Sequence, residues 1–128
     1  MRPDVTLYVS QKAFIRRGAE ALVLHDPIAG LDFPGGKLQD GETDLALALR
    51  REVSEETGLD VEIGAPFVVW LDTAHPISAR TGKAVLLVGY ACRCDAGEVR
   101  LSDERTASAG LALPSLPNST TVRATSRR

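Results

Sequence analysis

The chain has 128 residues, of which 44% are hydrophobic and 25% are charged, and its net charge at pH 7 is −2. This length and ordinary composition predict one domain with a buried core. The small negative charge argues against the basic surface that duplex nucleic acid requires. No apolar stretch reaches the roughly 18 residues of a membrane span, and the chain does not start with a signal-peptide pattern. We therefore expect neither a nucleic-acid nor a membrane partner.

Strand-like stretches dominate the first third of the chain. Residues 5–15 and 19–24 are rich in β-forming residues and flank a turn at residues 16–18, which predicts a hairpin. A loop at residues 26–30 then leads to a short strand at residues 31–33.

A helix is predicted to follow and to end at Gly58, because glycine suits a left-handed C-cap. The candidate N-caps are Thr43 and Asp44. In an unbroken helix Leu45 would share a face with Glu52, since it lies seven residues, almost two turns, earlier. We therefore expect the helix either to begin after Leu45 or to contain a π-type bulge.

The second half of the chain is predicted to hold further strands. Residues 61–63 and 66–71 favour strand, residues 72–83 a polar loop, and residues 84–92 a central apolar strand. The cysteines at positions 92 and 94 are expected on opposite faces of that last strand, so no disulfide is expected between them. Two thiols are too few for a structural zinc site. This cysteine content indicates a reduced, cytoplasmic protein.

The composition changes near the C-terminus. Residues 105–128 contain four arginines, no acidic residue and no aromatic residue, and they show no helical period. Such a segment buries little apolar surface, so we predict a domain at residues 1–104 followed by a disordered or atypical tail.

Three glutamates form the most informative cluster. If their segment is helical, Glu52, Glu55 and Glu56 lie on one face, because they are three and four residues apart. Like charges at this spacing destabilise a helix. A hard divalent cation with oxygen ligands would offset that cost. A solvated helix face is the alternative interpretation of the same residues.

The residues around these glutamates resemble the Nudix box, which is a glycine, five residues, a glutamate, seven residues and then Arg-Glu-apolar-x-Glu-Glu-x-Gly-apolar. The matching residues are Gly36, Glu42, Arg51, Glu52, Val53, Glu55, Glu56, Gly58 and Leu59. One departure is clear, because eight residues rather than seven separate Glu42 from Arg51. The box covers about a quarter of the chain.

The resemblance implies an α/β fold, the Nudix α/β/α sandwich, with a mixed sheet and the box helix on one side. Relatives usually continue past a stretch like residues 102–104 into a Trp-bearing strand and a closing helix. The C-terminal segment shows neither, so we predict that the closing helix is shortened or missing. The exposed sheet face that this would leave favours self-association into a homodimer.

The implied activity is hydrolysis, dependent on Mg²⁺ or Mn²⁺, of a diphosphate linkage in a nucleoside diphosphate joined to another group. The implied metal ligands are Glu52, Glu55, Glu56 and the carbonyl of Gly36. One of the three glutamates, or Glu104, would take the proton of the attacking water. Glu104 is equally well interpreted as an ordinary surface residue.

The resemblance also assigns supporting residues. Glu42 and Arg51 would form an ion pair that fixes the loop against the helix, and the extra residue lies between them. Lys37, Arg51 and Trp70 are the candidates for substrate binding, although Trp70 is more readily interpreted as a core residue. Two other classes of function remain open: a catalytically impaired Nudix domain that binds nucleotide without turnover, and a small acidic protein with no site. Stabilisation by a metal ion would argue against the last of these.

Overall fold

The structure is a computed structural model of the chain, and it describes residues 2–26, 30–100, 106–107 and 111–112. Two helices are present in these ranges, α1 at Leu45–Thr57 and α2 at Pro76–Thr81. The strands are β1 Tyr8–Arg17, β2 Glu20–Ala21, β3 Leu24–Asp26, β4 Gly30–Asp32, β5 Gly35–Lys37, β6 Glu62–Asp72, β7 Val85–Arg93, β8 Thr106–Ala107 and β9 Leu111–Ala112. None of the helices in the described ranges has the length and apolar character needed to cross a bilayer.

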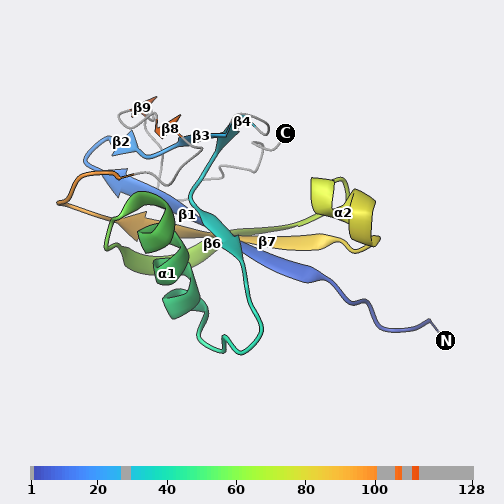
Figure 1. Ribbon diagram of the computed structural model, residues 1–128. Coiled ribbons are helices and arrows are strands. Elements are labelled where there is room, and N and C mark those ends of the chain that lie inside the picture. The colour runs from blue at the N-terminus through green and yellow to red at the C-terminus, as the bar shows by residue number, and fades with distance from the viewer. Residues whose placement is uncertain (1, 27–29, 101–105, 108–110, 113–128) are drawn as a thin grey trace.

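Six of the strands form one mixed sheet (Figure 1). Their order is β6-β7-β1-β2-β9, and β5 also pairs with β1. β1 and β7 are parallel over nine residue pairs, whereas the other neighbours in this sheet are antiparallel. A second, small sheet has the order β4-β3-β8. The mixed sheet with helices is the Nudix-type α/β architecture that the sequence predicts.

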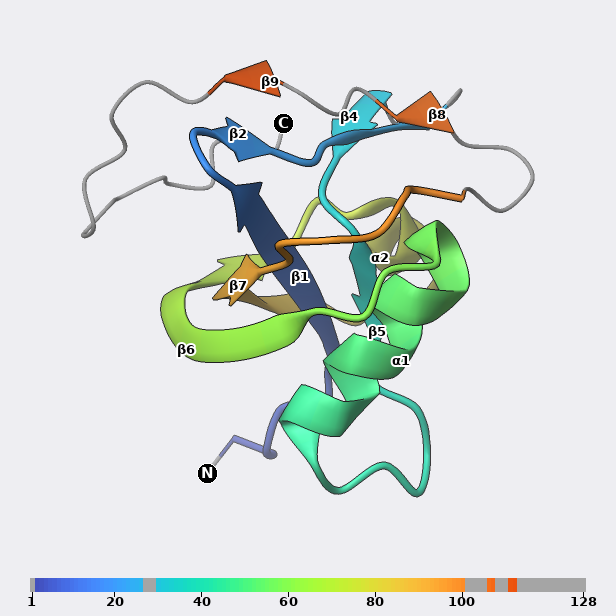
Figure 2. The same ribbon diagram turned by 90° about the vertical axis from the view of Figure 1, so that its left-hand side faces the viewer.

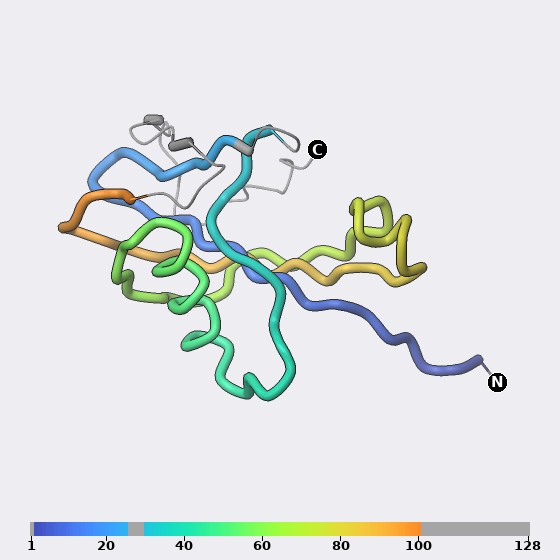
Figure 3. The backbone as a smooth tube through the Cα atoms, in the orientation of Figure 1, coloured from blue at the N-terminus to red at the C-terminus, as the bar shows by residue number. Residues whose placement is uncertain are grey.

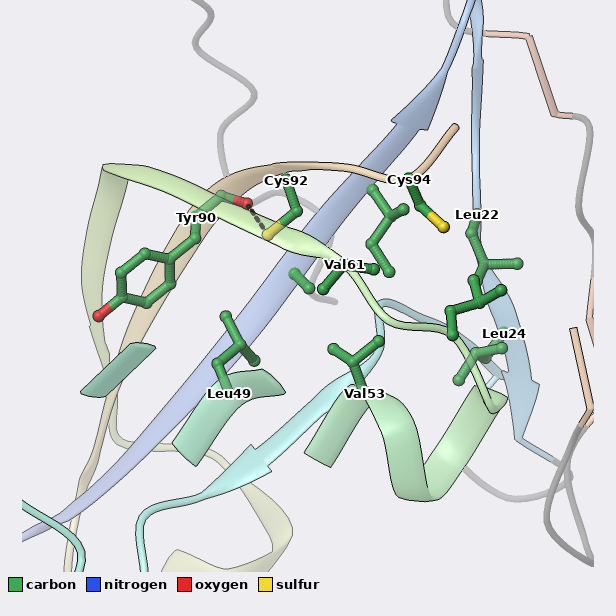
Figure 4. Close-up of a cluster of buried hydrophobic side chains, with 11 residues drawn as sticks. Leu22, Leu24, Leu49, Val53, Val61, Tyr90, Cys92 and Cys94 are labelled. Atoms are coloured by element: carbon green, nitrogen blue, oxygen red, sulfur yellow. Dashed lines mark hydrogen bonds between the residues drawn. The ribbon is translucent and has the colours of Figure 1, made fainter. Parts of the chain in front are cut away.

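α1 covers one face of the large sheet and packs on its main core (Figure 4). Alternate residues of β1 and β7 point toward the helix, as expected of extended strands. The buried members of this core are Ala13, Ile15, Leu22, Leu24, Leu49, Val53, Leu59, Val61, Tyr90, Cys92 and Cys94.

Both cysteines belong to this single core and are free thiols. The expectation that Cys92 and Cys94 point to opposite faces was therefore wrong. Residues two apart in a strand share a face, because successive side chains alternate. Burial raises the pKa of the Cys92 thiol to about 11, so this thiol stays protonated at neutral pH.

The polar loop predicted at residues 72–83 contains a helix instead, α2. Its N-cap is His75, whose Nδ1 accepts a hydrogen bond from the Ile77 N–H, and its C-cap is Gly82 with φ +74°. Ile77 packs with Val85 and Leu87 in a second cluster. This cluster lies on the sheet face opposite α1, because Val85 is an odd number of residues from the Tyr90 of the main core.

The start of α1 differs from both sequence-based expectations. The helix begins at Leu45 and runs without a bulge, and Asp44 is the N-cap whose side chain accepts hydrogen bonds from the backbone of Ala46 and Leu47. Leu45 is 45% exposed, so the leucine that would share a face with Glu52 lies at a partly solvent-facing first turn and not in the core. The predicted end is confirmed, since Gly58 is the C-cap with φ +75°.

Two short strands fall within residues 105–128, where the sequence predicts no element. β8 pairs with β3, and β9 pairs with β2. These contacts join four residues of the segment to the N-terminal part of the chain. The rest of the segment, and with it the expectation of a missing closing helix, lies outside the described residues.

Candidate active site

The carboxylates of α1 lie beside the glycine strand β5. Figure 3 follows the chain from β5 through residues 38–44 and back into α1, and Figure 2 shows the helix and β5 side by side. The Gly35 N–H donates a hydrogen bond to Glu56 Oε1 at 3.0 Å. A Cβ placed on Gly36 would be 2.5 Å from Glu52 Oε1. Two of the three predicted glutamates are thus in place against the glycine backbone.

Both glycines are required by this close approach. Gly35 has φ +151°, and a Cβ there would lie 1.9 Å from the carbonyl oxygen of Gln11. At Gly36 a methyl group would occupy the space in which the Glu52 carboxylate lies, and the Glu52 side chain is only 14% exposed. Glycine therefore allows β5 to lie between β1 and the helix.

Arg51 is the centre of the charged network. Its Nε donates to Glu42 Oε2 at 2.8 Å and its Nη2 to Glu42 Oε1 at 3.2 Å, the paired geometry that a guanidinium forms with a carboxylate. The same side chain donates to Glu52 Oε2 at 3.1 Å and to Glu55 Oε1 at 3.0 Å. The ion pair between Glu42 and Arg51 is therefore present despite the extra residue between them.

These contacts perturb the protonation equilibria of the ion pair. The hydrogen bond from Arg51, together with that from the Gln39 N–H, holds the pKa of Glu42 below its usual value of 4.5. The hydrogen bond to Glu42 in turn raises the pKa of the Arg51 guanidinium. Both residues are thus charged throughout the neutral range, as a structural ion pair requires.

The candidate ligands have the oxygen donors that a divalent cation prefers, but their side chains do not converge on one point. Among the described residues no three Asp, Glu, His or Cys side chains converge closely enough to hold an ion. Arg51 instead bonds Glu52 and Glu55, while Glu56 accepts a hydrogen bond from Gly35 of β5. All candidate donors are nevertheless carboxylate oxygens beside a glycine backbone, which is the ligand type that hard divalent cations prefer.

The remaining predicted residues lie in different places. Lys37 is exposed at the end of β5, where it pairs with Ser10 of β1. Trp70 is half-buried against the second cluster, on the face opposite α1, and so does not join the carboxylates. Glu104 lies outside the described residues.

An aromatic cluster that sequence reasoning did not identify lies on the face opposite α1. The ring of Phe14 is 4.1 Å from that of Phe33 and 5.0 Å from that of Phe67, measured between centroids. A Cβ on Gly89 would be 2.7 Å from the Phe14 ring, so this glycine makes room for the ring. Beside the cluster, Lys12 Nζ forms an ion pair with Asp32 at 3.0 Å.

Only part of that cluster had a signal in the sequence. Lys12 and Phe14 are two residues apart in a strand and share a face. Phe33 directly precedes the Pro-Gly-Gly turn. No local pattern connects them to Phe67, which β6 brings to the cluster through its pairing with β7.

Comparison with protein families gives one domain over most of the chain. The model of the NUDIX domain matches residues 7–117. The chain therefore belongs to the Nudix family, and it is a diphosphate hydrolase of the Nudix type. A comparison with curated proteins gave no match.

Solved structures support the same assignment. A MutT Nudix hydrolase from Burkholderia pseudomallei is 27% identical, with a TM-score of 0.69 over 91% of this chain and 92% of that one. A MutT protein from Methanosarcina mazei Go1 is 26% identical, with a TM-score of 0.70 over 92% and 90%. An ADP-ribose pyrophosphatase from Streptococcus suis 89-1591 is 25% identical, with a TM-score of 0.65 over 88% and 78%.

Proposed function

We propose that the protein hydrolyses the diphosphate linkage of a nucleoside diphosphate joined to another group, with Mg²⁺ or Mn²⁺ as cofactor. The observation that carries this proposal is the position of Glu52 and Glu56 against the backbone of Gly35 and Gly36. A diphosphate is a flexible anion, so a site for it needs close backbone approach and concentrated carboxylates that hold a cation. The close backbone approach is found between β5 and α1, where Glu52 and Glu56 lie against it. The third carboxylate, Glu55, is paired with Arg51.

Glu52, Glu55 and Glu56, with the carbonyl of Gly36, are the residues that would hold the cation. When bound, such a cation neutralises charge on the diphosphate and lowers the pKa of an attacking water. The proton of that water passes to one of these glutamates or to Glu104. Arg51 keeps the helix and the loop in register through Glu42.

The aromatic cluster supports a nucleoside as part of the substrate. Phe33 is two residues before Gly35, so their Cα atoms are at most about 7.6 Å apart. Phe67 is 37% exposed, which leaves aromatic surface accessible on this side of the sheet. A planar base stacked there would lie on the sheet face opposite α1, so its phosphates would have to pass around β5 to reach the carboxylates. Lys37, exposed at the end of β5, would offer them a positive charge there.

A second candidate, nucleotide binding without turnover, follows from the contacts of Arg51. Its guanidinium bonds both Glu52 and Glu55, so a cation must compete with it for these carboxylates. If Arg51 prevails, the domain binds nucleotide and is stabilised by it but releases no product.

One screen separates the two candidates. Nucleoside diphosphate derivatives and nucleoside triphosphates are incubated with the protein and Mg²⁺ or Mn²⁺, and phosphate is measured after treatment with a phosphatase. Glu55→Gln serves as the site variant, and Glu62→Gln serves as its control because Glu62 pairs with Arg93 on the surface of β6. Turnover that falls at least about tenfold in Glu55→Gln but not in Glu62→Gln supports hydrolysis. Stabilisation by a nucleotide without turnover supports the binding module instead. If the protein shows neither turnover nor stabilisation, both proposals are overturned.

A further inference from the structure

A buried glutamine connects the sheet to the first residue of α1. The Gln11 side chain is on the α1 face of β1, and Gln11 is 2% exposed. Its Nε2 donates a hydrogen bond to the carbonyl oxygen of Leu45 at 3.0 Å. Its Oε1 accepts one from the hydroxyl of Tyr90 at 2.8 Å. Both ends of the amide are therefore used in the core, where an unpaired polar group would be costly.

The Leu45 carbonyl and Tyr90 together fix which way the Gln11 amide points, because a carbonyl oxygen can only accept and so requires the NH₂ group. A hydroxyl that donates to Oε1 leaves the NH₂ group directed at Leu45. Tyr90 is 5% exposed, and burial raises the pKa of its hydroxyl, so the group remains a protonated donor at neutral pH. This orientation gives the helix start a hydrogen-bond donor in a fixed direction.

The backbone of the same glutamine contacts the glycine strand. Gln11 is the register partner of Gly36 in the β1–β5 pairing. Its carbonyl oxygen is also the atom that a Cβ on Gly35 would approach to 1.9 Å. One residue thus fixes β5 through its backbone and α1 through its side chain.

This connection matters for the carboxylates because apolar packing alone is not directional. Leu49 and Val53 hold α1 on the sheet, yet hydrophobic contact does not by itself prevent the helix from sliding along its axis. A hydrogen bond to the Leu45 carbonyl does select one axial position. It acts just after Asp44, within the segment that carries the extra residue.

We propose that Gln11, oriented by Tyr90, is a positioning residue that sets the register of α1 against β5. It thereby determines where Glu52 and Glu56 meet the backbone of Gly35 and Gly36. The consequence for cation binding rests on the proposed function, whereas the consequence for helix register does not.

The test compares Gln11→Leu with the core variant Ile15→Val, which removes one methylene from the same face of β1 without a hydrogen bond to the helix. Tyr90→Phe is the intermediate variant, since it removes the orienting hydroxyl but leaves the Gln11 amide. The first readout is hydrogen exchange at the Gly35 N–H, which is bonded to Glu56. We expect Gln11→Leu to accelerate it about tenfold beyond any change in global stability, and Ile15→Val not to do so.

The second readout is cation affinity from the shift in melting temperature with Mg²⁺ or Mn²⁺. Gln11→Leu is expected to weaken it by up to about tenfold, the lower end of the effects seen for outer-sphere partners, because Gln11 acts through the helix and bonds no proposed ligand. Tyr90→Phe is expected to lie in between. The proposal is overturned if Gln11→Leu and Ile15→Val behave alike, with both exchange at Gly35 and cation affinity changing only as much as global stability does. If the wild-type protein binds no cation, the proposed function fails, while exchange at Gly35 still decides the role of Gln11.

Discussion

Arg51 binds Glu42 through two nitrogens, with Nε 2.8 Å from Oε2 and Nη2 3.2 Å from Oε1. This pair joins α1 to the loop that precedes it, across a segment one residue longer than the usual Nudix pattern. α1 runs unbroken from Leu45 to Thr57, and the spacing from Arg51 to the glutamates that follow it is that of the box, so the extra length lies before Arg51. The departure in spacing therefore leaves the carboxylate half of the helix in its usual register.

Replacement of Arg51 by lysine should disrupt the site although it keeps the charge. An ammonium group cannot form the planar fork that holds Glu42 while bonding Glu52 and Glu55. We expect turnover to fall at least about tenfold, on the scale found for outer-sphere partners of a metal site. The control is Arg50→Lys, because Arg50 pairs with the exposed Asp60. Equal activity of the two variants would show that the fork is dispensable.

Replacement of Glu55 by glutamine tests the proposed cation site directly. Glu55 has a 61% exposed side chain, so the change preserves shape and should leave the fold intact. Turnover is expected to fall by about tenfold to a hundredfold, because a site that works by charge loses one carboxylate. The measurement is steady-state kinetics alongside Glu62→Gln and a thermal melt. Wild-type turnover in the purified variant would remove Glu55 from the site.

Replacement of Gly36 by alanine should displace Glu52. The new Cβ would lie 2.5 Å from Glu52 Oε1, which is closer than such atoms approach, so the carboxylate must move. We expect weaker cation binding together with a lower melting temperature. A double-mutant cycle with Glu52→Ala isolates this cause, since truncation of Glu52 should make Gly36→Ala nearly neutral for stability. A penalty of the same size in both backgrounds would point to the strand pairing instead.

The pH dependence of stability should reveal the ion pair of Glu42. Its pKa is lowered in the folded state, mainly by the hydrogen bond from Arg51, so the folded state favours the carboxylate. Stability from this group is therefore fully present above the ordinary pKa of 4.5 and is lost as the pH falls through the lower folded value. The melting temperature of wild type minus that of Glu42→Gln should be positive at pH 7 and shrink toward zero in acid. A difference that does not change with pH would contradict this account.

The sequence predicts those features of the molecule that depend on neighbouring residues. Gly58 ends α1 as expected, because a left-handed C-cap is a local requirement. The relation of Glu42 to Arg51 follows from the motif. The helix start was mispredicted because a leucine on the same helix face as Glu52 was judged implausible, whereas Asp44 caps the helix and Leu45 is partly exposed at its start.

Features that depend on distant segments could not be predicted. α2 is an exception that was missed for a local reason, because its N-cap is a histidine nitrogen, which is not among the usual capping groups. The bond from Gln11 to Leu45 joins residues 34 positions apart, and that from Tyr90 to Gln11 joins residues 79 apart. The sequence pattern of one strand cannot reveal such partners, because which strands lie next to each other must be known first.

The two halves of the proposed substrate site differ in how they are encoded along the chain. The glycines and the three helix carboxylates all lie between Gly35 and Glu56, joined by one loop, so one continuous segment supplies the proposed cation ligands. The aromatic cluster draws on Phe14, Phe33 and Phe67, which come from separate segments. Substitutions in β1 or β6 would therefore change the base that the proposed site prefers, while the segment from Gly35 to Glu56 stays unchanged. With this division, mutations in the aromatic cluster can change the preferred substrate while the residues that carry out the reaction stay the same.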